Sequence, residues 1–392
     1  MLAALVRVLG DFELAEDALQ DACALALRRW HDTVPDDPMA WLLTAARNRA
    51  IDRLRRARTG REKQEQAEEP RPMTGFEEDR LVSLGDERLS LVFTCCHPAL
   101  AEEARVALTL HAVVGLTAGQ IARVFLVAES TLAQRLVRAK RKIRDAGISL
   151  AVPPDHLLPE RLSGVLAVVY LIFTQGYTAA TDTPEHQQLR AEAIRLGKLV
   201  ATLMPDEPEA FALVALLLLH DSRAAARHSP AGDVVLLADQ DRDRWDRARI
   251  AEAVGLLDRA LRHGTVGRYQ LQAAIAALHA QAPSTDATDW PRIAALYGEL
   301  LMVAPSPVVA LNHAVAVAMT DGPAAGLALI DRIGGLDRYH LRHAARADLL
   351  SRLGRTDEAA AAYRRAHELA ANPADRRFLA GRLLAIDTSE ST

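Results

Sequence analysis

The sequence predicts an all-α fold, and three observations support this prediction. Half of the 392 residues are apolar but only 4% are aromatic, and alanine and leucine dominate. Few stretches combine β-branched residues with turn signals, so strands are not expected. Apolar residues recur at three- and four-residue steps along most of the chain, as on one face of a helix. The length allows two or three domains with ample buried core.

Charge and cysteine content narrow the class of protein. The net charge is −4, so the whole protein is not a polycation, but two short stretches in its N-terminal part are strongly basic. Cys23, Cys95 and Cys96 give no disulfide framework, which indicates a reducing cytoplasm. Neighbouring thiols on a helix diverge, and no second Cys/His pair lies at ligand spacing, so we expect no metal and no cofactor.

No feature of the chain predicts membrane insertion or export. The most apolar run, Phe211 to Leu219, is too short to span a bilayer and is flanked by charge. The start at Met1 leads directly into an amphipathic pattern, without a signal peptide. We therefore expect a cytoplasmic protein.

Residues 11–30 predict a helix with two distinct faces. Leu14, Ala18, Ala22 and Leu25 form an apolar seam. An acidic, exposed stripe is expected opposite, made of Glu13, Asp17 and Asp21 at four-residue steps with Glu16 and Gln20 beside them. Like charges at this spacing repel, and a basic partner would explain why the chain tolerates that cost. A solvated acidic face is the alternative.

A second helix is expected to begin at Asp37-Pro38, an N-cap acceptor followed by proline in the first turn. Leu43, Ala46, Ala50 and Leu54 are predicted to pack inward. Arginines interleaved with Trp41, Thr44 and Asn48 suit phosphate contact and stacking on unpaired bases. The alternative is a solvated arginine face.

Residues 115–144 predict a helix-turn-helix. Thr117 and Gln120 form a capping box, Ile121, Ala122 and Phe125 turn inward, and Leu126–Ala128 break the helix. The second helix begins near Glu129 and buries Leu132, Leu136, Ala139 and Ile143. Its other faces are expected to offer hydroxyl, amide and guanidinium groups to a major groove: Ser130, Thr131, Gln134, Arg135, Arg138, Lys140, Arg141, Lys142 and Arg144. A basic amphipathic hairpin without DNA contact is the alternative.

Two linkers separate these segments. Thr59–Gly75 is polar and proline-bearing, without apolar periodicity, and Ala151–Pro159 contains three prolines. Between the linkers, helices are expected at Phe76–Cys96 and Glu102–Val114.

Two small basic helical modules joined by a polar linker resemble the extracytoplasmic-function (ECF) group of the sigma-70 family of bacterial RNA polymerase sigma factors. ELAEDALQDA (Glu13–Ala22) and WLLTAARNRAIDRLRR (Trp41–Arg56) resemble region 2, and LTAGQIARVFLVAESTLAQRLVRAKRKI resembles region 4. Members of this group usually have a further helix before the position of Met1, so the resemblance implies that region 2 is short at its N-terminus here. Either the true start lies upstream, or core binding and promoter melting are weakened. Three motifs in the right order are far more specific than one helix-turn-helix.

The resemblance implies a role for each set of residues. Glu13, Glu16, Asp17, Gln20 and Asp21 would bind core RNA polymerase. The promoter −10 element would be handled by Trp41, Asn48, Asp52, Arg53 and Arg56. The −35 element would be read by Ser130, Thr131, Gln134, Arg135, Arg138 and Arg141.

The long C-terminal part is predicted to be a helical extension. In the stretch Ala345–Pro373, Ala347, Gly354, Ala359, Tyr363 and Ala366 follow the spacing of a tetratricopeptide repeat (TPR). Related pairs at Arg292–Ile333 and Arg249–Ala280 favour a TPR-like solenoid over an irregular bundle. The combination resembles sigma factors with a fused C-terminal repeat extension, which implies a regulator or a dock for a protein or ligand partner.

The expected domains are region 2 (residues 1–60), a flexible linker (61–76), region 4 (77–147), a second linker (148–160) and the TPR-like extension (161–392). No phosphate loop, dinucleotide fingerprint or HExxH motif occurs, so no catalytic residue and no enzymatic activity are expected. Scattered histidines such as His220 and His279 are interpreted as structural. The alternative function is a one-component DNA-binding regulator whose repeat domain senses a ligand or protein.

Overall fold

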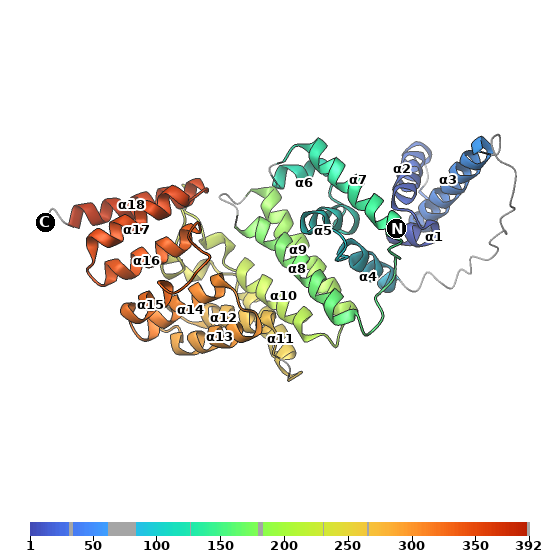
Figure 1. The fold of residues 1–392 in the computed structure, drawn as a ribbon. Helices are drawn as coiled ribbons and strands as arrows, with labels where there is room; N and C mark the ends of the chain where they lie inside the picture. Colours follow the sequence, from blue (N-terminus) through green and yellow to red (C-terminus); the bar gives the residue numbers. More distant parts are fainter. Residues whose placement is uncertain are drawn as a thin grey trace. The chain divides into compact units, whose positions relative to one another are not determined.

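A computed structural model describes residues 1–30, 34–61, 84–125, 127–178, 183–229, 231–264 and 266–389. Over these residues the chain is helical, and its only β-type pairing is an isolated bridge between His228 and Val234 (Figure 1). The all-α prediction is confirmed. The chain divides into two compact units, Met1–Leu171 and Ile172–Thr392.

The first unit begins with three helices, α1 (Leu2–Leu9), α2 (Phe12–Arg29) and α3 (Pro38–Arg61). Gly10 ends α1 at a φ of 69°, in the left-handed region that glycine adopts without strain. The Asp11 carboxylate then accepts a hydrogen bond from the Leu14 amide and caps α2. The buried alanines of α2, among them Ala18 and Ala22, allow α3 to pack closely against it.

The second part of this unit holds the predicted helix-turn-helix. Its elements are α4 (Leu84–Cys95), α5 (Glu102–Thr109), the π-helical turn η2 (Leu110–Val114), α6 (Ala118–Val124) and α7 (Glu129–Asp145). The predicted helix Glu102–Val114 is therefore not uniform, because its last turn widens before Gly115. Residues 76–83 of the expected helix Phe76–Cys96 lie outside the described residues. Cys95 and Cys96 are buried.

Helix α8 (Leu158–Tyr177) belongs to the first unit up to Leu171 and to the second unit from Ile172 onward. In the part up to Leu171, the guanidinium of Arg161 donates to the carbonyl of Phe93 over 2.7 Å, which ties α8 to α4. The C-terminal extension was predicted to begin within α8, but the N-terminal part of this helix packs on the helix-turn-helix module.

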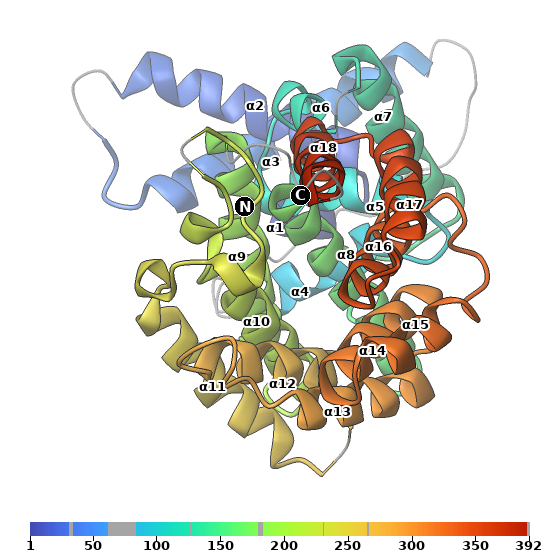
Figure 2. The same cartoon turned by 90° about the vertical axis from the view of Figure 1, so that its left-hand side faces the viewer.

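The second unit is a succession of helices in which each packs on the next. They are α9 (Pro184–Leu203), α10 (Pro208–Asp221), α11 (Arg247–Leu261), α12 (Arg268–Gln281), α13 (Trp290–Val303), α14 (Pro307–Thr320), α15 (Pro323–Ile330), α16 (His340–Arg352), α17 (Thr356–Leu369) and α18 (Pro373–Ser389). From α11 to α17 they follow one another along a curved row (Figure 2). Every residue from Ala210 to Leu219 is buried, so α10 is an internal helix.

The residues that predicted a repeat in this unit do pack together. Gly354 turns the chain between α16 and α17 at a φ of 70°. Ala347, Ala359, Tyr363 and Ala366 are all buried in one apolar cluster. A helical C-terminal unit is thereby confirmed, while its classification as a tetratricopeptide array stays a prediction.

Among the residues that the structure describes, no helix is both long and apolar enough to cross a membrane.

Candidate nucleic-acid interface

The helix-turn-helix has the local geometry that the sequence predicts. The hydroxyl of Thr117 accepts from the Gln120 amide at 3.2 Å, and the Gln120 side chain accepts from the Thr117 amide at 2.9 Å. This reciprocal pair fixes the start of α6 and the angle at which the chain enters it. The apolar face of α7 is buried at Leu132, Leu136, Ala139 and Ile143. With this face buried, most polar residues of α7 lie outward, and Lys140 is an exception.

Five of the six residues expected to read duplex DNA are exposed on α7: Ser130, Thr131, Gln134, Arg138 and Arg141. Arg135, the sixth, is half-buried. Hydroxyl, amide and guanidinium groups on one accessible helix face are the donors and acceptors that match base edges in a major groove. The recognition residues that the sequence indicates are therefore brought together.

Helix α3, which carries the residues expected at the −10 element, starts as predicted. The Asp37 carboxylate accepts from the amides of Met39 and Ala40, at 3.0 and 2.9 Å. Ala46 and Ala50 are buried and Asn48 is exposed. The side chains of Asp52, Arg53 and Arg56, although α3 runs through their positions, lie outside the described residues.

Trp41 does not lie on a fully exposed face. Its ring is half-buried and contacts that of Trp30 edge-on, with centroids 5.2 Å apart. The pair joins the end of α2 to the start of α3 and leaves part of the Trp41 ring accessible.

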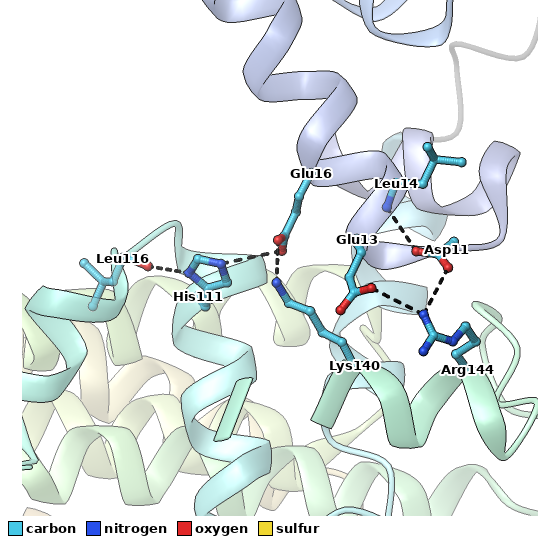
Figure 3. A network of polar contacts seen from close by, with 8 residues as sticks. All are labelled: Asp11, Glu13, Leu14, Glu16, His111, Leu116, Lys140 and Arg144. Atoms are coloured by element: carbon cyan, nitrogen blue, oxygen red, sulfur yellow. Dashed lines mark hydrogen bonds and ion pairs between the residues drawn. The ribbon is translucent and has the colours of Figure 1, made fainter. Parts of the chain in front are cut away.

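The acidic face of α2 is only partly as expected. Glu13, Asp17 and Gln20 are exposed and Asp21 is half-buried. The side chain of Glu16 is only 18% exposed, because one of its oxygens meets Lys140 of α7 and the other lies 3.5 Å from His111 Nε2 (Figure 3). The prediction that Glu16 belongs to an exposed stripe is thus wrong, since a cationic partner from a distant part of the chain covers it.

Lys140 is the second departure from the sequence prediction. It was expected on the DNA-facing side of α7, but its side chain is only 9% exposed and pairs with Glu16. A sign of this was present in the spacing, because Lys140 follows Leu136 by four residues and so shares its face. Arg144 also turns toward α2, with its guanidinium 3.3 Å from Glu13 and 3.7 Å from Asp11 (Figure 3).

The contacts of the two ring nitrogens of His111 favour its doubly protonated form. The ring Nδ1 lies 2.8 Å from the carbonyl oxygen of Leu116, which can only accept, so Nδ1 carries a proton. The other nitrogen, Nε2, then donates toward Glu16 only when the ring is doubly protonated. Glu16 accordingly raises the pKa of His111 above its usual value, against the opposing effect of burial.

The pKa of Glu16 shifts in the direction that matches this arrangement. Burial raises the pKa of its carboxyl, but His111 and Lys140 outweigh burial and bring the pKa below its usual value. The ionised carboxylate is therefore the stable form of Glu16 at this contact.

Comparisons with known proteins agree with the motifs on α2, α3, α6 and α7. The family models "Sigma-70 region 2" and "Sigma-70, region 4" match residues 1–59 and 90–143. Residues 161–261 match a "Family of unknown function (DUF6596)".

Individual relatives extend the similarity. An uncharacterised protein of Rhizobium meliloti (strain 1021) is 44% identical over 391 residues, which cover 96% of this chain and 91% of the relative. The probable ECF RNA polymerase sigma factor SigI of Mycobacterium tuberculosis is 31% identical over 38% of this chain and 52% of its own length. SigK of Mycobacterium bovis (strain BCG / Pasteur 1173P2), described as an ECF RNA polymerase sigma factor, is 30% identical over 36% of this chain and 75% of its own length. The chain therefore belongs to the ECF group of the sigma-70 family, with a helical C-terminal unit added to its two sigma regions.

Proposed function

We propose that this protein directs core RNA polymerase to specific promoters, and that α7 reads the −35 element. The observation that carries this proposal is the accessible polar face of α7 above a buried apolar face. The reading residues are Ser130, Thr131, Gln134, Arg135, Arg138 and Arg141. A good bidentate contact with a base edge discriminates by about 1–3 kcal/mol, enough for a few such residues to select a promoter.

Promoter opening is assigned to α3. Trp41, Asn48, Asp52, Arg53 and Arg56 would hold the −10 element and its unpaired strand. Bases stack on aromatic rings and arginines contact the phosphates, so capture of the opened strand favours melting without a catalytic group. The accessible part of Trp41, at the α2–α3 junction, supports this role.

Core polymerase would bind the acidic face of α2 through Glu13, Glu16, Asp17, Gln20 and Asp21. A capture assay with purified core enzyme tests this assignment. Reversing two charges with Asp17→Arg and Asp21→Arg should abolish capture, because an acidic docking face would become basic. The control is Asp258→Arg with Glu299→Arg, the same charge change at exposed positions of α11 and α13. Equal capture of both variants would contradict the docking role of α2.

Run-off transcription with core enzyme and a promoter library tests the reading role. Gln134→Ala and Arg138→Ala should relax selection at individual −35 positions, by roughly five- to a hundred-fold per position. Lys142→Ala, at an exposed position outside the reading set, should weaken all promoters evenly. Unaltered promoter choice in the first two variants would rule out base reading by α7.

The second unit is proposed to regulate the sigma regions or to dock a protein or ligand partner. Exposed apolar side chains at the turn between α13 and α14, Met302, Val303 and Val308, support a docking role. A chain that ends at Tyr177 keeps α8 whole and removes the rest of the second unit. We expect its transcription and partner capture to differ from those of the full chain. If both were unchanged, the second unit would have no regulatory or docking role.

A further inference from the structure

The region 2 helix α2 and the region 4 helix α7 are joined by charged side chains. Lys140 of α7 contacts one carboxylate oxygen of Glu16, and His111 of η2 approaches the other at 3.5 Å (Figure 3). Arg144, one turn further along α7, lies between Glu13 and Asp11. We call Asp11, Glu13, Glu16, His111, Lys140 and Arg144 the α2–α7 latch.

The centre of the latch is shielded from water and its edge is not. The side chains of Lys140 and Glu16 are 9% and 18% exposed, and that of His111 is 27% exposed. Arg144 and Glu13 are each nearly half exposed. Charges that are partly buried and paired are weakly screened, so the central pair should hold the two helices together at physiological salt.

A hollow of about 380 Å³, open to solvent, lies beside the latch. It is lined by Val6 and Phe12 from the first two helices and by Lys140, Ile143 and Arg144 from α7. Elsewhere region 2 and region 4 pack through α1 and α4, whereas α2 and α7 approach each other closely at few points, so their contact is made mainly by these long charged side chains. Loss of one charged partner should therefore open it.

The latch uses residues that the proposed function needs elsewhere. Glu13 and Glu16 belong to the face assigned to core polymerase. In this structure one oxygen of Glu16 contacts Lys140, the other lies 3.5 Å from His111, and Glu13 faces Arg144. A basic surface of another protein cannot pair with these carboxylates while α7 does.

We propose that the α2–α7 latch is an autoinhibitory contact, in which region 4 covers part of the region 2 face that binds core polymerase. This inference rests on the proposed function of α2. The free chain is then mostly closed, and polymerase binds the open form. Under such an equilibrium the apparent association constant equals the intrinsic association constant of the open form multiplied by the fraction of chains that are open.

A distance measurement tests the latch without polymerase. Spin labels are placed at Cys23, which is exposed, and at Ala133→Cys on the exposed side of α7; Cys95 and Cys96 are buried. A narrow distance distribution is expected in the parent chain and a broad one after Lys140→Glu. Lys142→Glu, the same change two residues later at an exposed position, should leave the distribution narrow.

Two further variants guard against a folding defect. Arg144→Glu changes a half-exposed side chain and should broaden the distribution less than Lys140→Glu does. The charge swap Glu16→Lys with Lys140→Glu should restore the narrow distribution, which a misfolded α7 would not allow. Narrow distributions in both Lys140→Glu and Arg144→Glu would overturn the latch.

The affinity for purified core polymerase then tests inhibition. Lys140→Glu should bind about tenfold more tightly than the parent chain, the factor expected if roughly 90% of the free chain is closed. A broadened distance distribution with unchanged core affinity would overturn the inhibitory role. If neither the parent chain nor any variant bound core polymerase, the proposed function would fail together with that role, while the distances would still decide whether the latch exists.

Discussion

Two shielded carboxylates, Glu16 in the first unit and Asp221 in the second, each meet two cationic groups. Glu16 contacts Lys140 and lies near His111, whereas Asp221 pairs with Arg190, 2.7 Å away, and with Arg249. The difference lies in what surrounds them. A hollow open to solvent lies beside Lys140 and Glu13, whereas the helices around Asp221 are in close contact.

The second unit shows this closeness at Gly176, whose carbonyl accepts from Arg190 at 3.0 Å. A Cβ atom at Gly176 would lie 2.5 Å from the carbonyl oxygen of His186, so α8 and α9 meet where only glycine fits. The ion pair of Asp221 therefore fixes helices that are already packed. The latch around Glu16 instead joins α2 and α7 mainly through charged side chains, and the proposed autoinhibition requires these two helices to separate.

The largest expected difference comes from removal of each carboxylate. Asp221→Ala leaves Arg190 buried without its counter-charge and should destabilise the second unit by about 3–5 kcal/mol. Glu16→Gln should cost under about 1 kcal/mol in unfolding, because Lys140 can reach water when the latch opens. Denaturant unfolding measures both. The exposed Asp258→Ala serves as control, expected within about 0.5 kcal/mol of the parent chain. Equal losses for Asp221→Ala and Glu16→Gln would show that the latch is as rigid as the second unit.

Acid should weaken the second unit through His220. This ring is half-buried beside Phe173 and Tyr177, and its loss of hydration lowers its pKa to about 3, with help from nearby arginines. A histidine with a lowered folded pKa is protonated first in the unfolded chain, so stability is lost as pH falls below about 6.5. The expected loss is roughly 1.4 kcal/mol per pH unit until the folded pKa is reached.

Burial also lowers the pKa of His279, to about 4, so His279 should add to this effect. Unfolding of His220→Gln should be less pH-dependent than that of the parent chain, and His263→Gln, at an exposed position, should match the parent. A pH profile unchanged by His220→Gln would contradict this account.

Close helix packing in the second unit can be tested by comparing two glycines, Gly326 and Gly298. A Cβ at Gly326 of α15 would lie 2.4 Å from the Ala318 Cβ and 2.7 Å from the Ala314 carbonyl oxygen of α14. Gly326→Ala should therefore destabilise the unit by about 1–3 kcal/mol. Gly298 in α13 has no atom within 4 Å of such a Cβ, so Gly298→Ala should stabilise by about 0.5–1 kcal/mol. The change in unfolding free energy relative to the parent chain should thus have opposite signs in the two variants. Changes of the same sign would contradict the close approach of α14 and α15.

The sequence could predict those features that depend on residues close together in the chain. The capping box of Thr117 and Gln120, the N-cap at Asp37 and the turn at Gly354 depend on neighbouring residues, and the structure has all three. Helical periodicity alone predicts the apolar face of α7 and the apolar seam of α2. In that seam Ala18 and Ala22 are buried, whereas Leu14 and Leu25 are half-buried.

The pairing of Glu16 with Lys140 could not be predicted in this way, because the two residues are 124 positions apart. Periodicity indicates which face of α7 Lys140 shares but not which carboxylate meets it. The Asp221 cluster also depends on how three helices cross, which no local pattern specifies. The roles of the individual interface residues stay predictions.

The smallest expected effect is the response of the latch to pH. Mild acid should strengthen the latch, whereas it should weaken the second unit. The raised pKa of His111 means that its protonated form strengthens the latch below about 6.5, and that this contribution is lost as pH rises through the raised value. The lowered pKa of Glu16 means that its contribution is present above about 4.5 and is lost in stronger acid.

The closed fraction should therefore be greatest between about pH 4.5 and 6.5 and fall modestly toward pH 8, since Lys140 still pairs with Glu16 there. The spin-label distances at Cys23 and Ala133→Cys measure it, and His111→Gln should remove the change between pH 6 and 8. A latch that opened on mild acidification would show that Glu16, and not His111, controls it. In that case acid would weaken both the latch and the second unit, and the contrast between them would rest on packing alone.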